Sequence, residues 1–177
     1  KESLKQQVFL IHGAGAGGVG IAEQIETALC EDGLDVEEAR SRILTLDSRG
    51  LIIYKDDLLP YKKKFAKDPA WLNWMQDEQD ARLENVVAKA GVTVLIGTSG
   101  QAGCFTKEIV QSMLNNTDRP VIMPLSNPTT MAEAIPADLY RWTEGRALIG
   151  TGSPFPLVEY NGRKYRVGQC NNVFVFP

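Results

Sequence analysis

The hydrophobic residues of this chain fall into short continuous runs, separated by longer stretches in which apolar residues recur at helical spacing. Short apolar runs are typical of strands that are buried on both faces of a parallel sheet. They predict strands at residues 8–11, 43–46, 92–96, 120–125, 146–150 and 172–176. The periodic stretches predict helices at residues 21–29, 35–42, 81–91, 107–116 and 136–143.

Local signals mark the ends of several of these elements. Asp35 and Glu38 have the spacing of a capping box, and Thr106 is placed to cap the helix that follows it. Asn161 and Gly162, between two short extended segments, predict a β-hairpin with a two-residue turn. These signals divide the periodic segments into separate, short elements.

The alternation of strand and helix predicts an α/β fold, with an open, mostly parallel, doubly wound sheet of the Rossmann type and helices on both faces. With 177 residues and 44% hydrophobic content, residues 1–177 are expected to form one domain. The polar segment 56–80 predicts a loop with short helices, in which Trp71 and Trp74 are spaced to share one helix face.

The composition excludes several classes of partner. Lys+Arg 19 nearly balances Asp+Glu 22, so the sequence shows no basic patch for nucleic acid. No apolar stretch approaches the ~20 residues that span a membrane, and the polar N-terminus is unlike a secretory signal. Cys30, Cys104 and Cys170 are odd in number and widely spaced, which argues against disulfides and a zinc site. We expect a soluble protein of the cytoplasm or another reducing compartment, such as the mitochondrial matrix.

Five glycines occur within residues 13–20, directly after the first apolar run. Gly13, Gly15 and Gly18 form G-x-G-x-x-G between a predicted strand and a predicted helix, which is the context of a dinucleotide site. Gly13 would allow the tight turn, Gly15 would admit a pyrophosphate, and Gly18 would let helix and strand pack. The N-terminus of the following helix is expected at Ala16, Gly17 and Gly18, whose N–H groups would face the phosphates. The alternative is that these glycines only form a tight turn.

Asp47 ends the second predicted strand, where a carboxylate can accept hydrogen bonds from the adenosine ribose. The same carboxylate would repel a 2′-phosphate, which favours NAD over NADP, although Arg49 and Lys55 are near enough in sequence to keep NADP possible. His12 is the only histidine, and its position at a strand end favours packing or backbone hydrogen bonding over a catalytic role.

Two polar clusters, residues 99–103 and 126–129, follow the third and fourth predicted strands. Both are therefore expected at the carboxyl edge of the sheet, where ligands bind in such folds. Asn127 offers a donor and an acceptor to a carboxamide or a carboxylate, or it caps the turn before Pro128. Asn171 and Asn172 raise the same alternatives, since adjacent asparagines are also a common turn.

Five segments together resemble the NAD-binding domain of the malic enzyme family, which oxidatively decarboxylates malate to pyruvate. They are GAGAGGVGIA, LDSRGLI, IGTSGQAGCFT, PLSNPTTMAEAIPADLYRWTEGRALIGTGSPFP and GQCNNVFVFP, in family order from Val8 to Pro177. The combination is far more specific than the glycine fingerprint alone. Cys170 departs from the family pattern, because this position is often glycine there and a side chain would crowd the nicotinamide.

The resemblance implies that the chain binds NAD, with NADP as the alternative, and that malate is the substrate. The implied cofactor-binding residues are Gly13, Gly15, Ala16, Gly17, Gly18, Asp47, Ser99, Gly100 and Asn127. The implied substrate-binding residues are Asn127, Asn171 and Asn172. It further implies that Mn²⁺ or Mg²⁺ in the full enzyme polarises the ketone intermediate.

The family's catalytic tyrosine, catalytic lysine and acidic metal ligands belong upstream of this domain, and nothing before Val8 resembles that region. We therefore expect no catalytic or metal-binding residue in this chain. We expect instead a fragment of a larger, homo-oligomeric enzyme, inactive by itself. The alternatives are the corresponding domain of a malolactic-type enzyme, or a nucleotide-binding regulatory module without catalysis.

Overall fold

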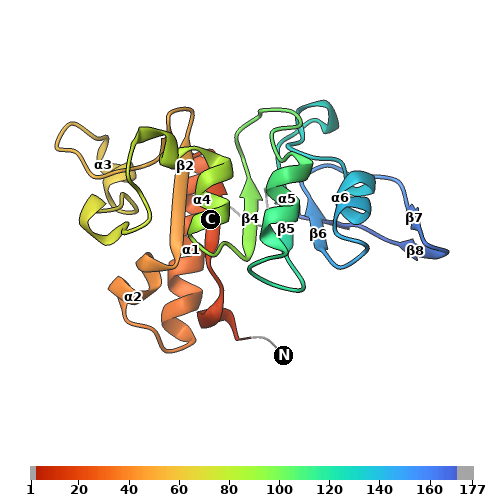
Figure 1. Ribbon diagram of the computed structural model, residues 1–177, viewed down its shortest axis with the longest axis horizontal. Coiled ribbons are helices and arrows are strands. Elements are labelled where there is room, and N and C mark those ends of the chain that lie inside the picture. The colour runs from red at the N-terminus through yellow and green to blue at the C-terminus, as the bar shows by residue number, and fades with distance from the viewer. Residues whose placement is uncertain (1–2, 171–177) are drawn as a thin grey trace.

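The computed structural model describes residues 3–170, which form a seven-stranded sheet and a separate two-stranded hairpin (Figure 1). The strand order in the large sheet is β3-β2-β1-β4-β5-β6-β9, and every neighbouring pair is parallel except β2 and β3. The strands are β1 (Phe9–His12), β2 (Ile43–Asp47), β3 (Gly50–Leu51), β4 (Val94–Gly97), β5 (Val121–Pro124), β6 (Leu148–Thr151), β7 (Val158–Tyr160), β8 (Arg163–Tyr165) and β9 (Gly168–Gln169).

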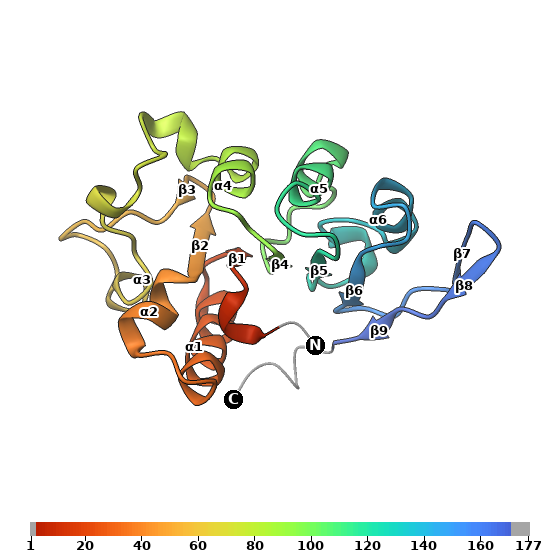
Figure 2. The same ribbon diagram turned by 60° about the horizontal axis from the view of Figure 1, so that its bottom comes forward.

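Helices lie on both faces of this sheet. The α-helices are α1 (Ala16–Glu31), α2 (Val36–Ser41), α3 (Pro60–Lys63), α4 (Leu83–Lys89), α5 (Lys107–Met113) and α6 (Pro136–Trp142). Short 3₁₀ turns are η1 (Leu4–Gln6), η2 (Pro69–Trp71), η3 (Glu78–Ala81) and η4 (Thr129–Met131). Figure 2 shows α4, α5 and α6 on one face, and α1 and α2 on the other. Within residues 3–170, no helix has both the length and the apolar character that crossing a membrane requires.

The core consists of two hydrophobic clusters, one on each face of the sheet. Successive side chains of a strand point to opposite faces, so Leu10 packs in the cluster of α4, α5 and α6, while Phe9 and Ile11 pack in the cluster of α1. The same division separates Leu95 from Ile96 in β4. Burial on both faces explains why the strands are continuous apolar runs, and it confirms the predicted doubly wound α/β fold.

The predicted end signals are confirmed. The Asp35 carboxylate accepts a hydrogen bond from the Glu38 amide at 2.8 Å, and the Glu38 carboxylate accepts one from the Asp35 amide at 3.4 Å. The Thr106 hydroxyl accepts a hydrogen bond from the third residue of α5. Asn161 and Gly162 have φ of +48° and +72° at the tip of the β7–β8 hairpin, as a two-residue hairpin turn requires.

Several elements differ from the sequence prediction. Helix α1 starts at Ala16, where the glycine fingerprint placed its N-terminus, although the apolar periodicity begins only at residue 21, because the glycine-rich segment itself forms the first turns. The expected shared face of two tryptophans is wrong: Trp71 is 67% exposed on η2, whereas Trp74 follows that turn and packs against the core. Strands β3 and β9 are too short to give a hydrophobic pattern. The strand predicted at residues 172–176 lies outside the described residues.

The strand order reverses at β1, because β2 lies on one side of it and β4 on the other, although all three strands are parallel. In open parallel sheets, such a reversal leaves a crevice beyond the carboxyl ends of the two strands that flank it. The loops after β1 and β4 therefore diverge at this point, and the loop after β5 lies next to them. The fold thus places the predicted glycine loop and both polar clusters at one edge of the sheet.

Candidate functional site

A cavity of about 390 Å³ opens at this edge, beyond the carboxyl ends of β1, β4 and β5. Its walls come from the three loops that follow these strands. The lining residues are Gly13, Gly15, Gly17, Gly18, Thr98, Ser99, Gly100, Leu125, Ser126 and Asn127. Most of the residues predicted to bind a cofactor therefore meet in one place.

Two predicted cofactor-binding residues, Ala16 and Asp47, and one predicted pair, Asn171 and Asn172, are not among the residues that line the cavity. Ala16 begins α1 at the mouth of the cavity without lining it, and Asp47 ends β2 outside the lining. Ser126, from the polar cluster predicted at this edge, also lines the cavity, as does Thr98, which precedes the other predicted cluster by one residue and was not predicted. Asn171 and Asn172 lie outside the described residues, so their predicted role stays a prediction.

The glycines of the fingerprint are required for different reasons. Gly13 has φ of +119°, and a Cβ there would lie 2.5 Å from the carbonyl carbon of Thr98. A Cβ on Gly18 would overlap the carbonyl oxygen of Gly13. Gly15 differs from both, because its backbone is extended and a Cβ there would meet no protein atom within 4 Å. Packing therefore requires glycine at positions 13 and 18. At Gly15 the free space belongs to the cavity and leaves room for a ligand.

The N-terminus of α1 can attract an anion. The N–H groups of its first turn, which starts at Ala16, have no intrahelical acceptor, and no side chain among residues 3–170 caps them. The amides just before the helix are already used, since those of Gly13 and Ala14 donate to the Leu46 carbonyl at 2.8 and 2.9 Å. The free donors therefore start at the cavity, at the positive end of a 16-residue helix. Together with the open space at Gly15, this geometry fits a phosphate group.

Asp47 forms an ion pair that the sequence did not reveal. Its Oδ2 accepts a hydrogen bond from Lys62 Nζ at 2.7 Å, and its Oδ1 accepts one from the Arg49 amide at 2.9 Å. Partial burial acts to raise the pKa of Asp47, but the Lys62 hydrogen bond, the Arg49 amide and the two positive charges hold it below its ordinary value. The carboxylate is therefore ionised at neutral pH, and its remaining lone pairs can accept hydrogen bonds from hydroxyl groups.

A buried carboxylate connects the loops after β4 and β5. Glu133 is 0% exposed, and its Oε1 accepts hydrogen bonds from the Ser99 amide (2.8 Å), the Ser99 hydroxyl (3.0 Å) and the Ser126 hydroxyl (2.5 Å). Its Oε2 accepts one from the Ser126 amide at 3.3 Å. Gly97, at the end of β4, provides the space, since a Cβ there would overlap the Glu133 carboxyl group. Sequence reasoning missed Glu133, because a single glutamate in a polar segment gives no signal.

His12 and Cys104 form a neutral pair behind this network. The distance from His12 Nδ1 to Cys104 Sγ is 3.5 Å. Burial lowers the pKa of His12, although the charge of Glu133 acts against this. Burial also raises the pKa of Cys104 to about 11. At neutral pH the pair therefore contains a thiol and an uncharged imidazole, so it lacks the thiolate that a cysteine nucleophile needs.

The side chain of Asn127 is exposed at the rim of the cavity. Its Oδ1 accepts a hydrogen bond from the Ser153 hydroxyl, and its Nδ2 donates to the Leu125 carbonyl at 3.3 Å. These bonds hold the amide in place and leave one N–H and one lone pair free. Asn127 therefore stabilises its turn and can still contact a ligand, so the two predicted roles are compatible.

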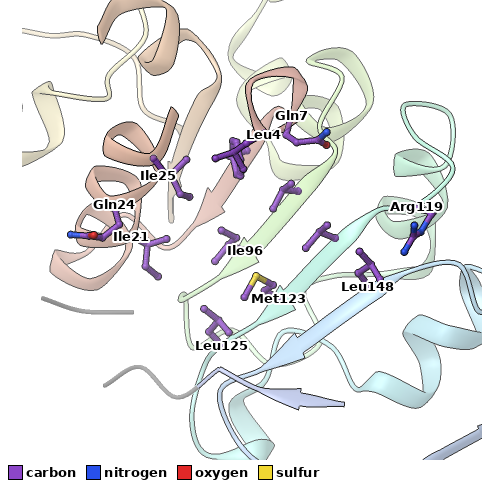
Figure 3. Close-up of a pocket in the computed structure, with 14 residues that line it drawn as sticks. Leu4, Gln7, Ile21, Gln24, Ile25, Ile96, Arg119, Met123, Leu125 and Leu148 are labelled. Carbon is purple, nitrogen blue, oxygen red and sulfur yellow. The ribbon is translucent and has the colours of Figure 1, made fainter. Parts of the chain in front are cut away.

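A second cavity, of about 770 Å³, lies on the face of β4, β5 and β6 beside α1, and shares Leu125 with the first cavity (Figure 3). Aliphatic side chains such as Ile96, Met123 and Leu148 form its floor, and Arg119 lies at one side (Figure 3). It is larger than the first cavity, but it contains none of the predicted site residues. Among residues 3–170, no three His, Cys, Asp or Glu side chains lie close enough together to hold a metal ion.

Comparisons with known proteins agree with this arrangement. Residues 1–177 match the family described as "Malic enzyme, NAD binding domain". The chain is 46% identical over 178 residues to the NAD-dependent malic enzyme of Acinetobacter baylyi, and 48% identical over 181 residues to NAD-dependent malic enzyme 3 of Bacillus subtilis. These alignments cover 99% and 100% of this chain, but only 31% and 32% of the two relatives. The chain therefore spans about a third of the length of the curated relatives that it matches.

Proposed function

The chain belongs to the malic enzyme family, as its NAD-binding domain, and from this we propose that residues 1–177 form a single domain that binds NAD in the cavity beyond β1, β4 and β5. The observation that carries the proposal is the uncapped N-terminus of α1 beside the open space at Gly15. Free N–H groups, the helix dipole and the absence of a Cβ are what a pyrophosphate needs. All three meet where the strand order reverses.

We assign the rest of the nucleotide from the positions of the strands. A dinucleotide in this type of fold lies across the reversal point, with one half on each side. Asp47, beyond β2, is proposed to accept hydrogen bonds from the adenosine ribose. Ser99, Gly100 and Asn127, beyond β4 and β5, are then proposed to contact the nicotinamide half. The ionised carboxylate of Asp47 favours NAD over a nucleotide with a 2′-phosphate.

We further propose that the longer protein oxidises malate to pyruvate and carbon dioxide, with Mn²⁺ or Mg²⁺ as its metal. Bound NAD supplies the hydride acceptor in this chemistry. The residues of this domain bind and orient NAD and malate. Among them, Asn127, Asn171 and Asn172 are proposed to face the malate carboxylate. The proton-transferring groups and the metal ligands are assigned to other parts of the longer protein.

A substitution at the helix mouth tests the nucleotide site. Ala16 is exposed and is the first residue of α1, where an aspartate is compatible with the helix dipole. Ala16→Asp should therefore preserve the fold but repel the pyrophosphate, and weaken NAD binding by about tenfold or more in calorimetric titration. Ala16→Asn, of the same shape without the charge, is the matched control. Equal affinities of the two variants for NAD would contradict the proposed site.

The proposed reaction is tested by product analysis. Malate, NAD and Mn²⁺ are incubated with the 177-residue chain and, separately, with the longer protein that carries it. We expect NAD binding without turnover from the chain, and pyruvate with an equal amount of NADH from the longer protein. Lactate without net NADH would identify the malolactic alternative, and no product from either would leave a nucleotide-binding module. Rapid turnover by the 177-residue chain would overturn the division of roles.

A further inference from the structure

The two walls of the cavity differ in the direction of their backbone N–H groups. On the α1 side, the N–H groups of the first helical turn have no intrahelical acceptor. On the opposite side, three consecutive amides donate to the hydrogen-bonded group formed by Glu133 and the hydroxyls of Ser99 and Ser126. The Ser99 amide donates to Glu133 Oε1 at 2.8 Å, the Gly100 amide to the Ser126 hydroxyl at 2.9 Å, and the Gln101 amide to the Ser99 hydroxyl at 3.1 Å.

The carboxylate of Glu133 fixes the direction of these hydrogen bonds. A carboxylate only accepts, so the hydroxyls of Ser99 and Ser126 must donate to it. Each hydroxyl then accepts a hydrogen bond from a backbone amide: the Ser126 hydroxyl from Gly100, and the Ser99 hydroxyl from Gln101. One side chain thereby sets the spacing of two loops and consumes the donors that would otherwise attract an anion.

The charge of Glu133 is balanced only by neutral donors. In the described part of the chain, no lysine, arginine or histidine lies within ion-pair distance of its carboxylate. A fully buried charge acts over a longer distance than an exposed one, because water does not screen it. The wall formed by Ser99, Gly100 and Ser126 is therefore negative, whereas the mouth of α1 is positive.

We propose that Glu133 is a positioning residue for the nicotinamide half of the cofactor. Glu133 holds the loops that contain Ser99 and Ser126 in place, and its charge makes the wall that they form bind the oxidised nicotinamide ring more tightly than the reduced one. The inference rests on the proposed NAD site. The oxidised nicotinamide ring carries a positive charge that reduction removes. A negative wall therefore stabilises bound NAD⁺ relative to NADH, and promotes release of the reduced cofactor. The pyrophosphate and the adenosine lie at the other wall and do not depend on Glu133.

The test compares three nucleotides on one variant. Glu133→Gln keeps the size of the side chain but removes the charge, and its NH₂ group faces amides that also donate. We expect NAD⁺ to bind about tenfold more weakly, NADH to be affected less, and ADP to keep its affinity, all measured by calorimetry. Glu84→Gln, at an exposed position on α4, is the matched control and should change none of the three.

The outcomes separate this proposal from the site on which it rests. If the wild-type protein fails to bind ADP and NAD⁺, the proposed function fails. If the wild-type protein binds both, two results would show that the inference about Glu133 is wrong. In one, Glu133→Gln weakens the binding of ADP, NAD⁺ and NADH equally; in the other, it leaves the ratio of NAD⁺ to NADH affinity unchanged. For Glu133→Gln, only a selective loss of NAD⁺ affinity supports the inference.

A second pair of variants keeps the test valid if Glu133→Gln does not fold. Ser126→Ala removes the hydroxyl between Glu133 and the Gly100 amide but retains the charge, whereas Ser126→Thr retains the hydroxyl. We expect the alanine variant to weaken NAD⁺ and NADH together, with ADP unaffected, and the threonine variant to recover most of the affinity. Unchanged NAD⁺ binding by Ser126→Ala would overturn the positioning role.

Discussion

The Lys62 ammonium pairs with the Asp47 carboxylate at the end of β2, with 2.7 Å between Nζ and Oδ2. Both side chains are largely shielded, at 18% and 25% exposure. The proposed ribose acceptor therefore carries its own counter-ion, which α3 brings from 15 residues further along the chain. The choice between NAD and NADP depends on both members of this pair.

Replacing Asp47 with serine should weaken NAD binding by about 1 to 3 kcal/mol, because a hydrogen-bonded carboxylate is lost at the ribose. The same change frees Lys62 to face a 2′-phosphate, so NADP should lose much less affinity or gain some. Calorimetric dissociation constants for both nucleotides check this. An equal loss for NAD and NADP would place the ribose elsewhere.

Replacing Lys62 with methionine should act in the opposite direction. Asp47 keeps its charge but loses the ion pair, so a 2′-phosphate meets an unbalanced carboxylate and NADP should bind about tenfold more weakly. NAD, which has a hydroxyl at that position, should change little. Lys63→Met is the control, because the Lys63 ammonium donates to the Asp56 carbonyl and not to Asp47. The ratio of NAD to NADP affinity is the quantity to compare.

The glycines of the fingerprint should separate stability from binding. Gly18→Ala places a Cβ against the Gly13 carbonyl, and should reduce the free energy of unfolding by about 1 to 3 kcal/mol. Gly15→Ala places a methyl group in open space on an extended backbone, so thermal stability should be retained while NAD affinity falls. Thermal denaturation and NAD titration of both variants provide the measurement. Loss of stability without loss of binding in Gly15→Ala would reverse the assignment.

Lys67 should make the stability of the domain depend on pH. It is 6% exposed, its ammonium donates to the Arg40 carbonyl, and burial lowers its pKa from 10.5 to about 8. Between pH 8 and 10.5 the unfolded chain therefore binds a proton that the folded protein does not, so this group makes folding more favourable as the pH rises. Below pH 8 both states are protonated, and the full cost of burying the charge remains.

Lys67→Met removes this contribution. The difference in unfolding free energy between the wild type and the variant should shift by about 2 to 3 kcal/mol in favour of the wild type from pH 7 to pH 10. Urea denaturation at the two pH values measures it, and Lys55→Met, at an exposed position, is the control. A difference that does not change with pH would show that the Lys67 ammonium is not desolvated.

The sequence was sufficient for the order of the main elements, because each carries a local signal. Continuous apolar runs mark strands buried on both faces, and Asp35 with Glu38 marks the start of α2 within a few residues. The glycine fingerprint located the helix mouth for the same reason. The apolar periodicity by itself missed the first turns of α1, since glycines are poor helix formers, and Gly18 packs there against the Gly13 carbonyl and Thr98.

The residues of the site also divide into those that the sequence could predict and those that it could not. Most of the residues that line the cavity could be predicted, since they lie in segments that follow strands whose carboxyl ends face the crevice. Lys62 and Glu133 could not, because the partners of each are distant in sequence and neither lies in a recognisable motif. Glu133 accepts hydrogen bonds from Ser99, 34 residues before it, and becomes a buried charge only when the loops after β4 and β5 meet.

The amino-acid sequence by itself therefore determined the fold class, the glycine-lined helix mouth and the resemblance to malic enzymes, since these depend on patterns within short segments. Only the tertiary structure decided which charges meet: Lys62 with Asp47, and Glu133 with two serines. Electrostatic interactions depend on distance and burial, and both are set by how separate segments pack.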